Sequence, residues 1–300
     1  MSARLRTSPE IADALARGAP VVCLETTLVA HGFPQGEGSA VGAASEAAVR
    51  AAGAIPATVG IIDGTLVVGL DDAEVRRFSE AGATARKVGA RDLAACCVQG
   101  ALGATTVGGT LAAVRGLGIE VMATGGLGGV HRGFPSPPDL SSDLAELART
   151  RAVIVSCGVK SLLDVPATSE LLETLGIPVL GYGTDTLPLF YAAAGGPPVS
   201  ARVESAAEAA AVARAHWELG APGAVALARP PEPSLDDVEP LIEEALADAL
   251  QQGVRGPAIT PFVLARLHGR SDGRTLHANR ELIVGNAALA GAVAVELAAH

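Results

Sequence analysis

Two lysines, Lys87 and Lys160, stand apart in a chain that otherwise carries arginine at its basic positions. The sequence contains 22 lysine and arginine residues together, and all but these two are arginines. Arginine can supply a surface charge as well as lysine can, but only lysine loses its proton when desolvated and then acts as a nucleophilic amine. The restriction of lysine to two positions therefore indicates a chemical task for at least one of them.

Further polar groups follow short apolar runs that we expect to be strands. Glu25 comes directly after "VVCL", Lys87 lies in "ARKVGA", and Lys160 follows "VIVSCG". A Thr-Thr pair and the glycine-rich segment "TGGLGGVHRG" (124–133) follow other such runs. In open α/β sheets, ligands bind outside the carboxyl ends of the strands. An acid, two lysines, hydroxyls and a glycine-rich loop could therefore meet at one edge of the sheet.

Three of these segments allow a structural as well as a functional interpretation. Glu25 is either a proton donor whose pKa is raised by partial burial, or a helix cap or buried salt-bridge partner. The glycine-rich loop either brings backbone amides to a phosphate or only connects two elements, and it has neither the G-x-G-x-x-G nor the Walker pattern. Asp139, Ser141 and Asp143 in "DLSSD" are either ligands of a hard cation or the start of a helix that Ser141 or Ser142 caps.

The asparagines are as rare as the lysines, since only Asn279 and Asn286 occur. They lie seven residues apart in a predicted terminal helix, so both face the same side, and we expect them to make specific amide hydrogen bonds. His31 and His131 each adjoin glycine in loops that we expect at the edge of the sheet. No motif resembles a Ser/His/Asp triad, and H-E-x-x-H is absent.

Strand-like apolar runs alternate with helical patterns along the sequence. Strand character is found at 20–27, 57–63, 65–70, 119–124, 152–158, 177–182 and 223–229. Helical patterns cover 39–53, 71–82, 91–101, a segment ending near 117, 141–150, 168–176, 206–220, 235–253 and two helices in the last 40 residues. Continuous apolar strands between helices predict a mostly parallel sheet covered on both faces. We therefore expect an α/β fold, with one three-layer α/β/α domain over residues 1–300.

The composition of the chain indicates the kind of core it forms and the classes of molecule it could bind. Hydrophobic residues make up 49% of the chain but aromatic residues only 3%, so the core must be aliphatic. A formal charge of -10 argues against a general nucleic-acid or membrane-surface binder, while leaving room for an anionic small molecule in a local basic pocket. The first 20 residues lack the apolar run of a signal peptide, and the four cysteines lack metal-ligand spacing. These features predict a soluble cytoplasmic protein with free thiols.

Taken together, a series of long motifs resembles the pseudouridine-5'-phosphate glycosidase family. The motifs are "LETTLVAHGFP", "KVGARDL", "GATTVGGT", "ATGGLGGVHRG", "DLSSDLAELART", "VSCGVKSLLDVPAT", "TPFVLARL" and "LHANRELIVGNAALA". They run in order from about residue 8 to the C-terminus, so the resemblance covers essentially the whole chain.

The resemblance implies an activity, a cofactor and an assembly. The activity is reversible cleavage of the C–C glycosidic bond of pseudouridine 5'-phosphate, which gives uracil and ribose 5-phosphate in nucleotide catabolism. The cofactor is Mn2+, with other divalent metals as alternatives. The assembly is a homotrimer, and the partners are small molecules without nucleic acid or membrane.

The resemblance also assigns residues by motif position. Lys160 matches the nucleophile and Glu25 the proton donor, while Asp139 matches the metal ligand. The positions that match or are expected to adjoin the substrate are Lys87, Val107, His131, Ser141, Ser142, Asp143 and Asn279. Asn286 is an alternative to Asn279 as the active-site asparagine, because the family often has a second asparagine where Gly285 stands in this sequence.

Lysine chemistry suits a C–C bond, because this bond offers no oxygen or nitrogen leaving group for two carboxylates to act on. An amine that attacks the anomeric carbon opens the ribose ring and gives an imine, which accepts electrons while uracil leaves. Lys87 would then favour the neutral form of the Lys160 amine or hold the substrate. A nucleotide-dependent dehydrogenase or sugar kinase would need a strand–G-x-G-x-x-G–helix unit, which the sequence lacks. The other alternative is an inactive ligand-binding protein on the same fold, in which Lys160 is charged and unreactive.

Overall fold

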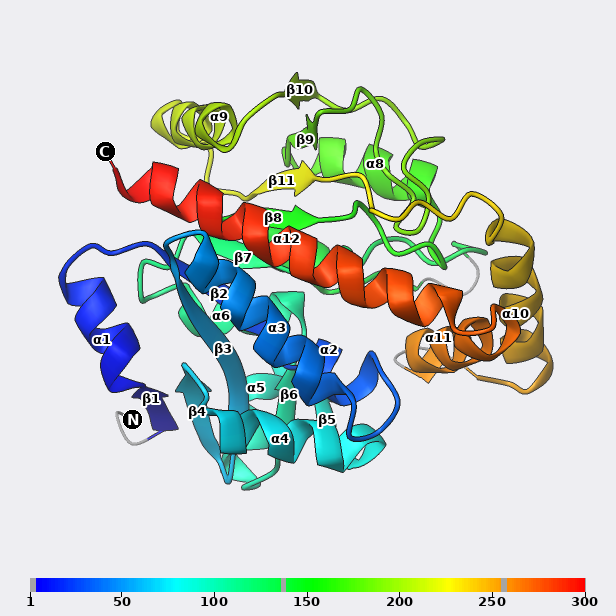
Figure 1. The fold of residues 1–300 in the computed structure, drawn as a ribbon, viewed down its shortest axis with the longest axis horizontal. Coiled ribbons are helices and arrows are strands. Elements are labelled where there is room, and N and C mark those ends of the chain that lie inside the picture. The colour runs from blue at the N-terminus through cyan, green and yellow to red at the C-terminus, as the bar shows by residue number, and fades with distance from the viewer. Residues whose placement is uncertain (1–3, 136–138, 255–257, 300) are drawn as a thin grey trace.

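A computed structural model describes residues 4–135, 139–254 and 258–299 (Figure 1). Its strands are β1 (Leu5–Thr7), β2 (Val21–Glu25), β3 (Ile55–Ile62), β4 (Thr65–Val68), β5 (Arg86–Val88), β6 (Gly103–Thr105), β7 (Val121–Ala123), β8 (Val153–Ser156), β9 (Val179–Tyr182), β10 (Ala201–Val203) and β11 (Val225–Ala228). Its helices are α1 (Pro9–Ala16), α2 (Thr27–His31), α3 (Gly38–Ala51), α4 (Asp72–Ala81), α5 (Leu93–Val98), α6 (Val107–Val114), α7 (Asp143–Leu147), α8 (Val165–Thr174), α9 (Ala206–Glu218), α10 (Glu239–Gln251), α11 (Ile259–Arg270) and α12 (Arg274–Ala298). Two 3-10 helices, η2 (Gly82–Thr84) and η3 (Ala90–Asp92), flank β5.

The described strands form one sheet in the order β1-β4-β3-β2-β7-β8-β11-β9-β10, with β6 beside β3 and β5 beside β6. Most neighbours are parallel, and β3 is antiparallel to both β4 and β6. The β3–β4 hairpin turns at Asp63 and Gly64, both with positive φ, as the Asp-Gly pair predicts. The prediction of a mostly parallel sheet is confirmed.

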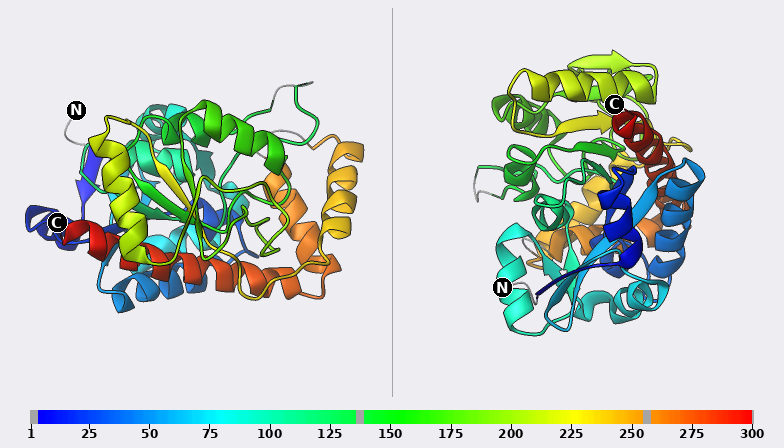
Figure 2. Two further views of the ribbon diagram at one scale, coloured as in Figure 1. Left: turned by 90° about the horizontal axis from the view of Figure 1, so that it is seen from above. Right: turned by 90° about the vertical axis from the view of Figure 1, so that its left-hand side faces the viewer.

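Successive residues of the central strands pack into different cores, because side chains alternate between the faces of a sheet. In β2, Val21 and Cys23 face the core that includes α6, while Val22 and Leu24 face the core under α12 and α9. β7, β8 and β11 repeat this alternation. Seen from above, α3 and α12 lie on one side of the sheet and α8 on the other (Figure 2). The three-layer α/β/α prediction is therefore confirmed.

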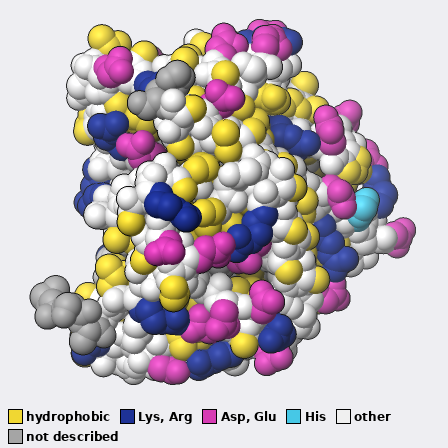
Figure 3. Space-filling view, turned by 60° about the vertical axis from the view of Figure 1, so that its left-hand side comes forward, with side chains coloured by type: hydrophobic (Ala, Val, Ile, Leu, Met, Phe, Trp, Pro, Cys, Tyr) yellow, Lys and Arg dark blue, Asp and Glu magenta, His cyan; other side chains and the backbone are white. Residues whose placement is uncertain are grey.

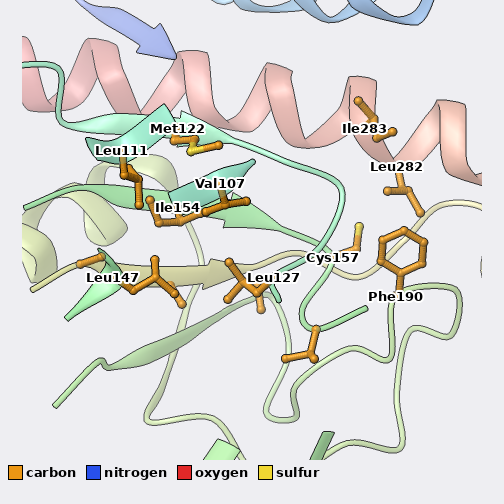
Figure 4. Close-up of a cluster of buried hydrophobic side chains, with 14 of the residues drawn as sticks. Val107, Leu111, Met122, Leu127, Leu147, Ile154, Cys157, Phe190, Leu282 and Ile283 are labelled. Atoms are coloured by element: carbon orange, nitrogen blue, oxygen red, sulfur yellow. The ribbon is translucent and has the colours of Figure 1, made fainter. Parts of the chain in front are cut away.

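The long helix α12 crosses the sheet diagonally beside α3 (Figure 1). It contacts β2, β7 and β8, and Leu282 and Ile283 point from it toward Phe190 and Cys157 (Figure 4). By length and composition alone it could cross a membrane, but half of its most apolar stretch is buried inside the protein. A helix that packs inside a protein core is apolar around most of its circumference, so burial accounts for the composition of α12.

Some elements differ from the sequence-based expectation. The helix expected at 91–101 starts as η3 and continues as the short α5, while α2 begins at Thr27, the last residue of the strand expected at 20–27. β1 and β10 were not predicted, because each has three residues that are mostly exposed and show no apolar run. On the face shown in Figure 3, acidic and basic side chains are interspersed among apolar ones.

Candidate active site

A cavity of about 280 Å³ opens beside the carboxyl ends of the central strands, where a ligand is expected in an open α/β sheet. Both lysines of the chain line it, together with Glu25. The other lining residues are Thr27, Gly89, Arg91, Asp92, Thr106, Gly128, His131, Asp139, Leu140, Ser141, Ser142, Asp143, Leu163 and Thr260. A larger hollow of about 840 Å³ between α8 and α10 contains neither lysine nor Glu25, so we take the smaller cavity as the candidate active site.

Glu25 is the most deeply placed acid in the cavity. It ends β2, is 4% exposed, and accepts a hydrogen bond from the Thr124 hydroxyl at the end of β7. Burial raises the pKa of its carboxyl, although the charge of Lys160 and the Thr124 hydrogen bond oppose this shift. The raised pKa extends the pH range over which the carboxyl keeps its proton, and the protonated form is the one that a proton donor needs. Glu25 is not a helix cap, and no salt bridge to it is found among the described residues.

The two lysines reach the cavity from different parts of the sheet. Lys160 follows β8 by four residues, and its backbone N–H donates to Leu127 O at 3.1 Å. Lys87 lies in β5, the outer strand of the β5–β6 pair. Neither ammonium group forms a salt bridge within the described residues. Burial, followed by the charge of Lys160, lowers the pKa of Lys87.

The loop that carries Lys160 is held close to the glycine-rich loop. Leu127 N–H donates to Gly158 O at 2.9 Å, so the two loops continue the β7–β8 pairing beyond the strands. Gly128 has space for no side chain, because a Cβ there would stand 2.2 Å from Ser141 Oγ and 2.7 Å from Asp143 Oδ2. At Gly128 the glycine-rich segment is thus a closely packed wall of the cavity, so it does more than connect two elements.

Asp143 joins the cavity to the N-terminus of another helix. Its Oδ1 accepts from Gly108 N–H at 2.8 Å and from Thr106 Oγ1 at 3.2 Å, at the start of α6. Ser142 is the N-cap of α7 by position but its side chain makes no capping hydrogen bond, and Ser141 Oγ accepts weakly from Asp143 N–H at 3.3 Å. The expected side-chain cap by Ser142 is therefore not formed, and the Asp143 side chain instead accepts hydrogen bonds from the first turn of α6.

Asp139 and His131 face each other at the side of the cavity. His131 Nδ1 lies 3.8 Å from Asp139 Oδ2, and the Asp139 side chain is one-third exposed. Burial lowers the pKa of His131, and the two lysines add to this effect against the opposing charge of Asp139. Within the described residues no group of three or more His, Cys, Asp or Glu side chains is arranged around a metal position. The donors present fit a hard cation held by one carboxylate, with water as its remaining ligands.

Two predicted substrate contacts, Val107 and Asn279, do not line the cavity. The Val107 side chain is fully buried in the core beside Leu111, Met122 and Ile154 (Figure 4), so the residue that faces the cavity there is its neighbour Thr106. Asn279 is buried under the end of α2 and donates to Gly32 O at 3.5 Å.

Asn286 supports the site from behind. Its Nδ2 donates to Thr124 O at 2.8 Å, and its Oδ1 accepts from Cys157 Sγ at 3.4 Å. Thr124 in turn holds the carboxyl of Glu25. Of the two asparagines, Asn286 is therefore the one connected through hydrogen bonds to the Glu25 strand and to the loop of Lys160.

Sequence reasoning assigned no individual role to five polar lining residues, namely Thr27, Arg91, Asp92, Thr106 and Thr260. Thr27 and Thr106 stand next to residues that were singled out, so the position at a strand end was a usable signal for both. Arg91 is one of 20 arginines, and its residue type alone carried no signal. Thr260 comes from α11, which reaches the cavity only through tertiary packing.

Comparison with known proteins gives consistent matches over nearly the whole chain. The family described as Indigoidine synthase A like protein matches residues 10–296. A protein of Myxococcus xanthus (strain DK1622) named pseudouridine-5'-phosphate glycosidase is 46% identical over 298 residues, which cover 98% of each sequence.

Two solved structures have a similar fold. The prealnumycin C-glycosynthase AlnA, in complex with ribulose 5-phosphate, superposes with a TM-score of 0.89 at 42% identity, over 99% of this chain and 97% of that one. An indigoidine synthase A-like protein from Thermotoga maritima MSB8 has a TM-score of 0.87 at 36% identity, over 98% of this chain and 97% of that one.

Proposed function

The chain belongs to the indigoidine synthase A-like protein family, and from this premise we propose that it is a pseudouridine-5'-phosphate glycosidase. The reaction cleaves the bond between C1' of the ribose and C5 of uracil with water, and gives uracil and ribose 5-phosphate. The main support for the proposal is that both lysines line the same cavity as Glu25, a buried carboxyl whose pKa is raised. This arrangement matches what an amine nucleophile and a proton donor require.

In the first step, the Lys160 amine attacks C1' of the ribose. The N–C1' bond forms as the C1'–O4' bond breaks, and Glu25 donates a proton to O4', which becomes a hydroxyl group. The attacking nitrogen then returns a proton to the Glu25 carboxylate. Thr124 fixes the position of the carboxyl during both transfers, since its hydroxyl donates to one carboxyl oxygen.

In the second step, Glu25, which again holds a proton, donates it to C5 of uracil as the C1'–C5 bond breaks. The electron pair of that bond stays on C5, while the lone pair of the Lys160 nitrogen forms a C=N double bond to C1'. Uracil leaves, and water hydrolyses the resulting imine to ribose 5-phosphate and free lysine. The overall stoichiometry is one water consumed, with no net uptake of protons.

The principal alternative function is synthesis of a C-glycoside, the reverse of the proposed cleavage. The same adduct formed from a sugar phosphate could be used to build a C–C bond, and a structural relative at 42% identity is named a C-glycosynthase. The more similar curated relative at 46% identity carries the glycosidase name. We therefore assign the cleavage of pseudouridine 5'-phosphate, in nucleotide catabolism, as the function.

The direct test is incubation of the purified protein with pseudouridine 5'-phosphate and Mn2+. We expect uracil and ribose 5-phosphate in equal amounts, measured by chromatography. Release of neither product, together with ready formation of a C-glycoside from ribose 5-phosphate and another aglycone, would reject the glycosidase in favour of the synthase.

The proposal includes a divalent metal at Asp139. A bound Mn2+ would supply positive charge to oxygen atoms of the substrate, and Asp139 with neighbouring water would hold it. We expect a chelator to abolish activity and Mn2+ to restore it, and we expect Asp139→Ala to raise the Mn2+ concentration needed for half-maximal activity. An Asp139→Ala protein with unchanged activity and metal dependence would refute the assignment.

The proposal also includes the 5'-phosphate as a required part of the substrate. Binding energy from this remote group can orient the sugar against Lys160 and Glu25. We expect kcat/KM for pseudouridine 5'-phosphate to exceed that for pseudouridine by on the order of 100-fold, from charge-assisted hydrogen bonds to the phosphate. Equal values for the two substrates would contradict this expectation.

The proposal also includes a cytoplasmic location and assembly into a homotrimer. The homotrimer would have the mass of three chains of 29.9 kDa each. Light scattering during size-exclusion chromatography measures this mass directly, and a monomeric mass in an active preparation would exclude the trimer.

A further inference from the structure

Lys160 is the first residue of a tight turn that ends at Leu163. Leu163 N–H donates to Lys160 O at 2.9 Å and closes the turn, while Lys160 N–H donates to Leu127 O at 3.1 Å. The turn is buried, since Ser161 is 6% exposed and Leu163 is 2% exposed. The position of the Lys160 amine therefore depends on the contacts that hold this turn.

The guanidinium of Arg132 contacts two carbonyl groups of the turn. Its Nη2 donates to Ser161 O at 2.8 Å, and its Nε donates to Leu163 O at 3.3 Å. No backbone N–H of the described residues donates to either oxygen. Because a carbonyl group in a buried segment needs a donor, the guanidinium is the group that stabilises the turn in this shape.

Arg132 reaches the turn from outside the active-site cavity. It lines the neighbouring hollow of about 840 Å³ and does not line the cavity that contains Lys160, whereas its neighbour His131 does. Leu163 lines both spaces and lies between them. Arg132 can therefore affect the reaction through the turn, without touching the substrate.

Glu239, the first residue of α10, pairs with the same guanidinium. Arg132 Nη2 lies 2.8 Å from Glu239 Oε1, but the Glu239 side chain is 51% exposed. Solvent screens an ion pair of this kind, so it contributes little. The two kinds of contact can be separated by experiment, because Glu239 can be changed while both carbonyl contacts of Arg132 stay.

We propose that Arg132 is a positioning residue for Lys160, which fixes the turn and thereby directs the amine toward the anomeric carbon. The inference rests on the proposed function for the role of Lys160 as the nucleophile. A displacement of about 1 Å in a reacting group can lower a rate about 100-fold. A residue behind the turn can therefore control the rate of attack.

The test measures kcat, KM and the rate at which ribose 5-phosphate and cyanoborohydride label Lys160 in the full chain. Arg132→Ala should lower kcat and the labelling rate about 10- to 100-fold and change KM by less than about twofold, because the groups that line the cavity remain. Arg132→Lys should give a smaller loss, since its ammonium group lacks the fork that spans both carbonyls. Added guanidinium ion should restore part of the labelling rate of Arg132→Ala, because the hollow gives it access to the vacated site, whereas methylammonium should not.

Glu239→Gln and Arg77→Ala are the matched controls. Glu239→Gln leaves both carbonyl contacts of Arg132 in place, and Arg77 in α4 pairs with the exposed Asp63 instead. Both variants should keep kcat within about twofold of the wild-type value. Thermal unfolding shows which variants are folded, and Arg132→Lys is the test if Arg132→Ala does not fold.

Unchanged kcat and labelling rate in folded Arg132→Lys and Arg132→Ala would overturn the proposal. An equal loss in Glu239→Gln, or a loss in Arg132→Ala that guanidinium does not relieve, would also overturn it. Uracil release is measured separately on the same preparations. A wild-type protein that releases no uracil, but in which Arg132→Ala slows the labelling of Lys160, would reject the glycosidase function and retain the positioning role.

Discussion

Lys160→Arg is expected to lower kcat by on the order of 10³-fold or more while the protein still folds. The substitution keeps a positive charge in the cavity but removes the only nucleophilic form that the side chain can take. The Lys160 side chain lines an open cavity rather than the core, so a larger head group does not disturb packing. Uracil release measures the loss, and thermal unfolding verifies that the fold is intact.

The covalent step can be observed without turnover. Incubation with ribose 5-phosphate and borohydride should reduce the imine to a secondary amine and add the mass of one ribose 5-phosphate less one oxygen atom. Peptide mapping should place this mass on Lys160, and the assignment is simple because the chain offers one other lysine side chain.

Lys87→Arg is the matched control for the trapping experiment. It changes the second lysine of the same cavity, so it should impair turnover yet leave the label on Lys160. Label on Lys87 in the wild-type protein would exchange the roles of the two lysines. A fully active Lys160→Arg protein would exclude the covalent mechanism.

The positions of Lys160 and Glu25 could be predicted because they depend on short-range patterns. β2 and β8 are buried runs that are apolar up to their last residue, and polar residues at or shortly after the end of such a run lie at the carboxyl edge of the sheet. Lys87 was identified by its type, since its strand has only three residues. The reactive residues at strand ends are therefore the part of this site that short sequence patterns can predict.

The remaining parts of the site depend on contacts between distant segments. Asp143 caps α6 from 35 residues away, and neither its spacing nor its type distinguishes this role from capping its own helix. Thr260 reaches the cavity because α11 packs against α12 and α10, at the opposite end of the chain from Glu25. Propensity and periodicity describe single elements, so they leave such contacts undetermined.

The edge strands of the sheet also could not be predicted from local sequence patterns. β1 and β10 pair with β4 and β9 through their backbones, while their side chains are largely exposed. A strand of this kind has no apolar periodicity to read, because it is stabilised by its neighbour rather than by burial.

Glu25→Gln is expected to abolish most of the activity and to stabilise the protein. Glutamine has the shape of the carboxyl and can accept the Thr124 hydrogen bond, but it cannot donate a proton to the substrate. General acid catalysis contributes about 10²- to 10⁴-fold, so we expect a loss of kcat in this range. Glu218→Gln, at the exposed end of α9, is the control for the substitution itself and should retain full activity.

The gain in stability should depend on pH in a direction fixed by the raised pKa of Glu25. Below its ordinary value of 4.5 the carboxyl is protonated in both the folded and the unfolded chain, so its ionisation costs the wild-type protein nothing. As pH rises above 4.5 the unfolded chain releases the proton while the buried carboxyl retains it, and the free energy of unfolding of the wild type falls until the folded pKa is passed. Glutamine does not ionise, so the advantage of Glu25→Gln in urea unfolding should be larger at pH 8 than at pH 5. An advantage that shrinks with rising pH would mean that the attraction of Lys160 outweighs burial, and that Glu25 rests as a carboxylate rather than as the proton donor.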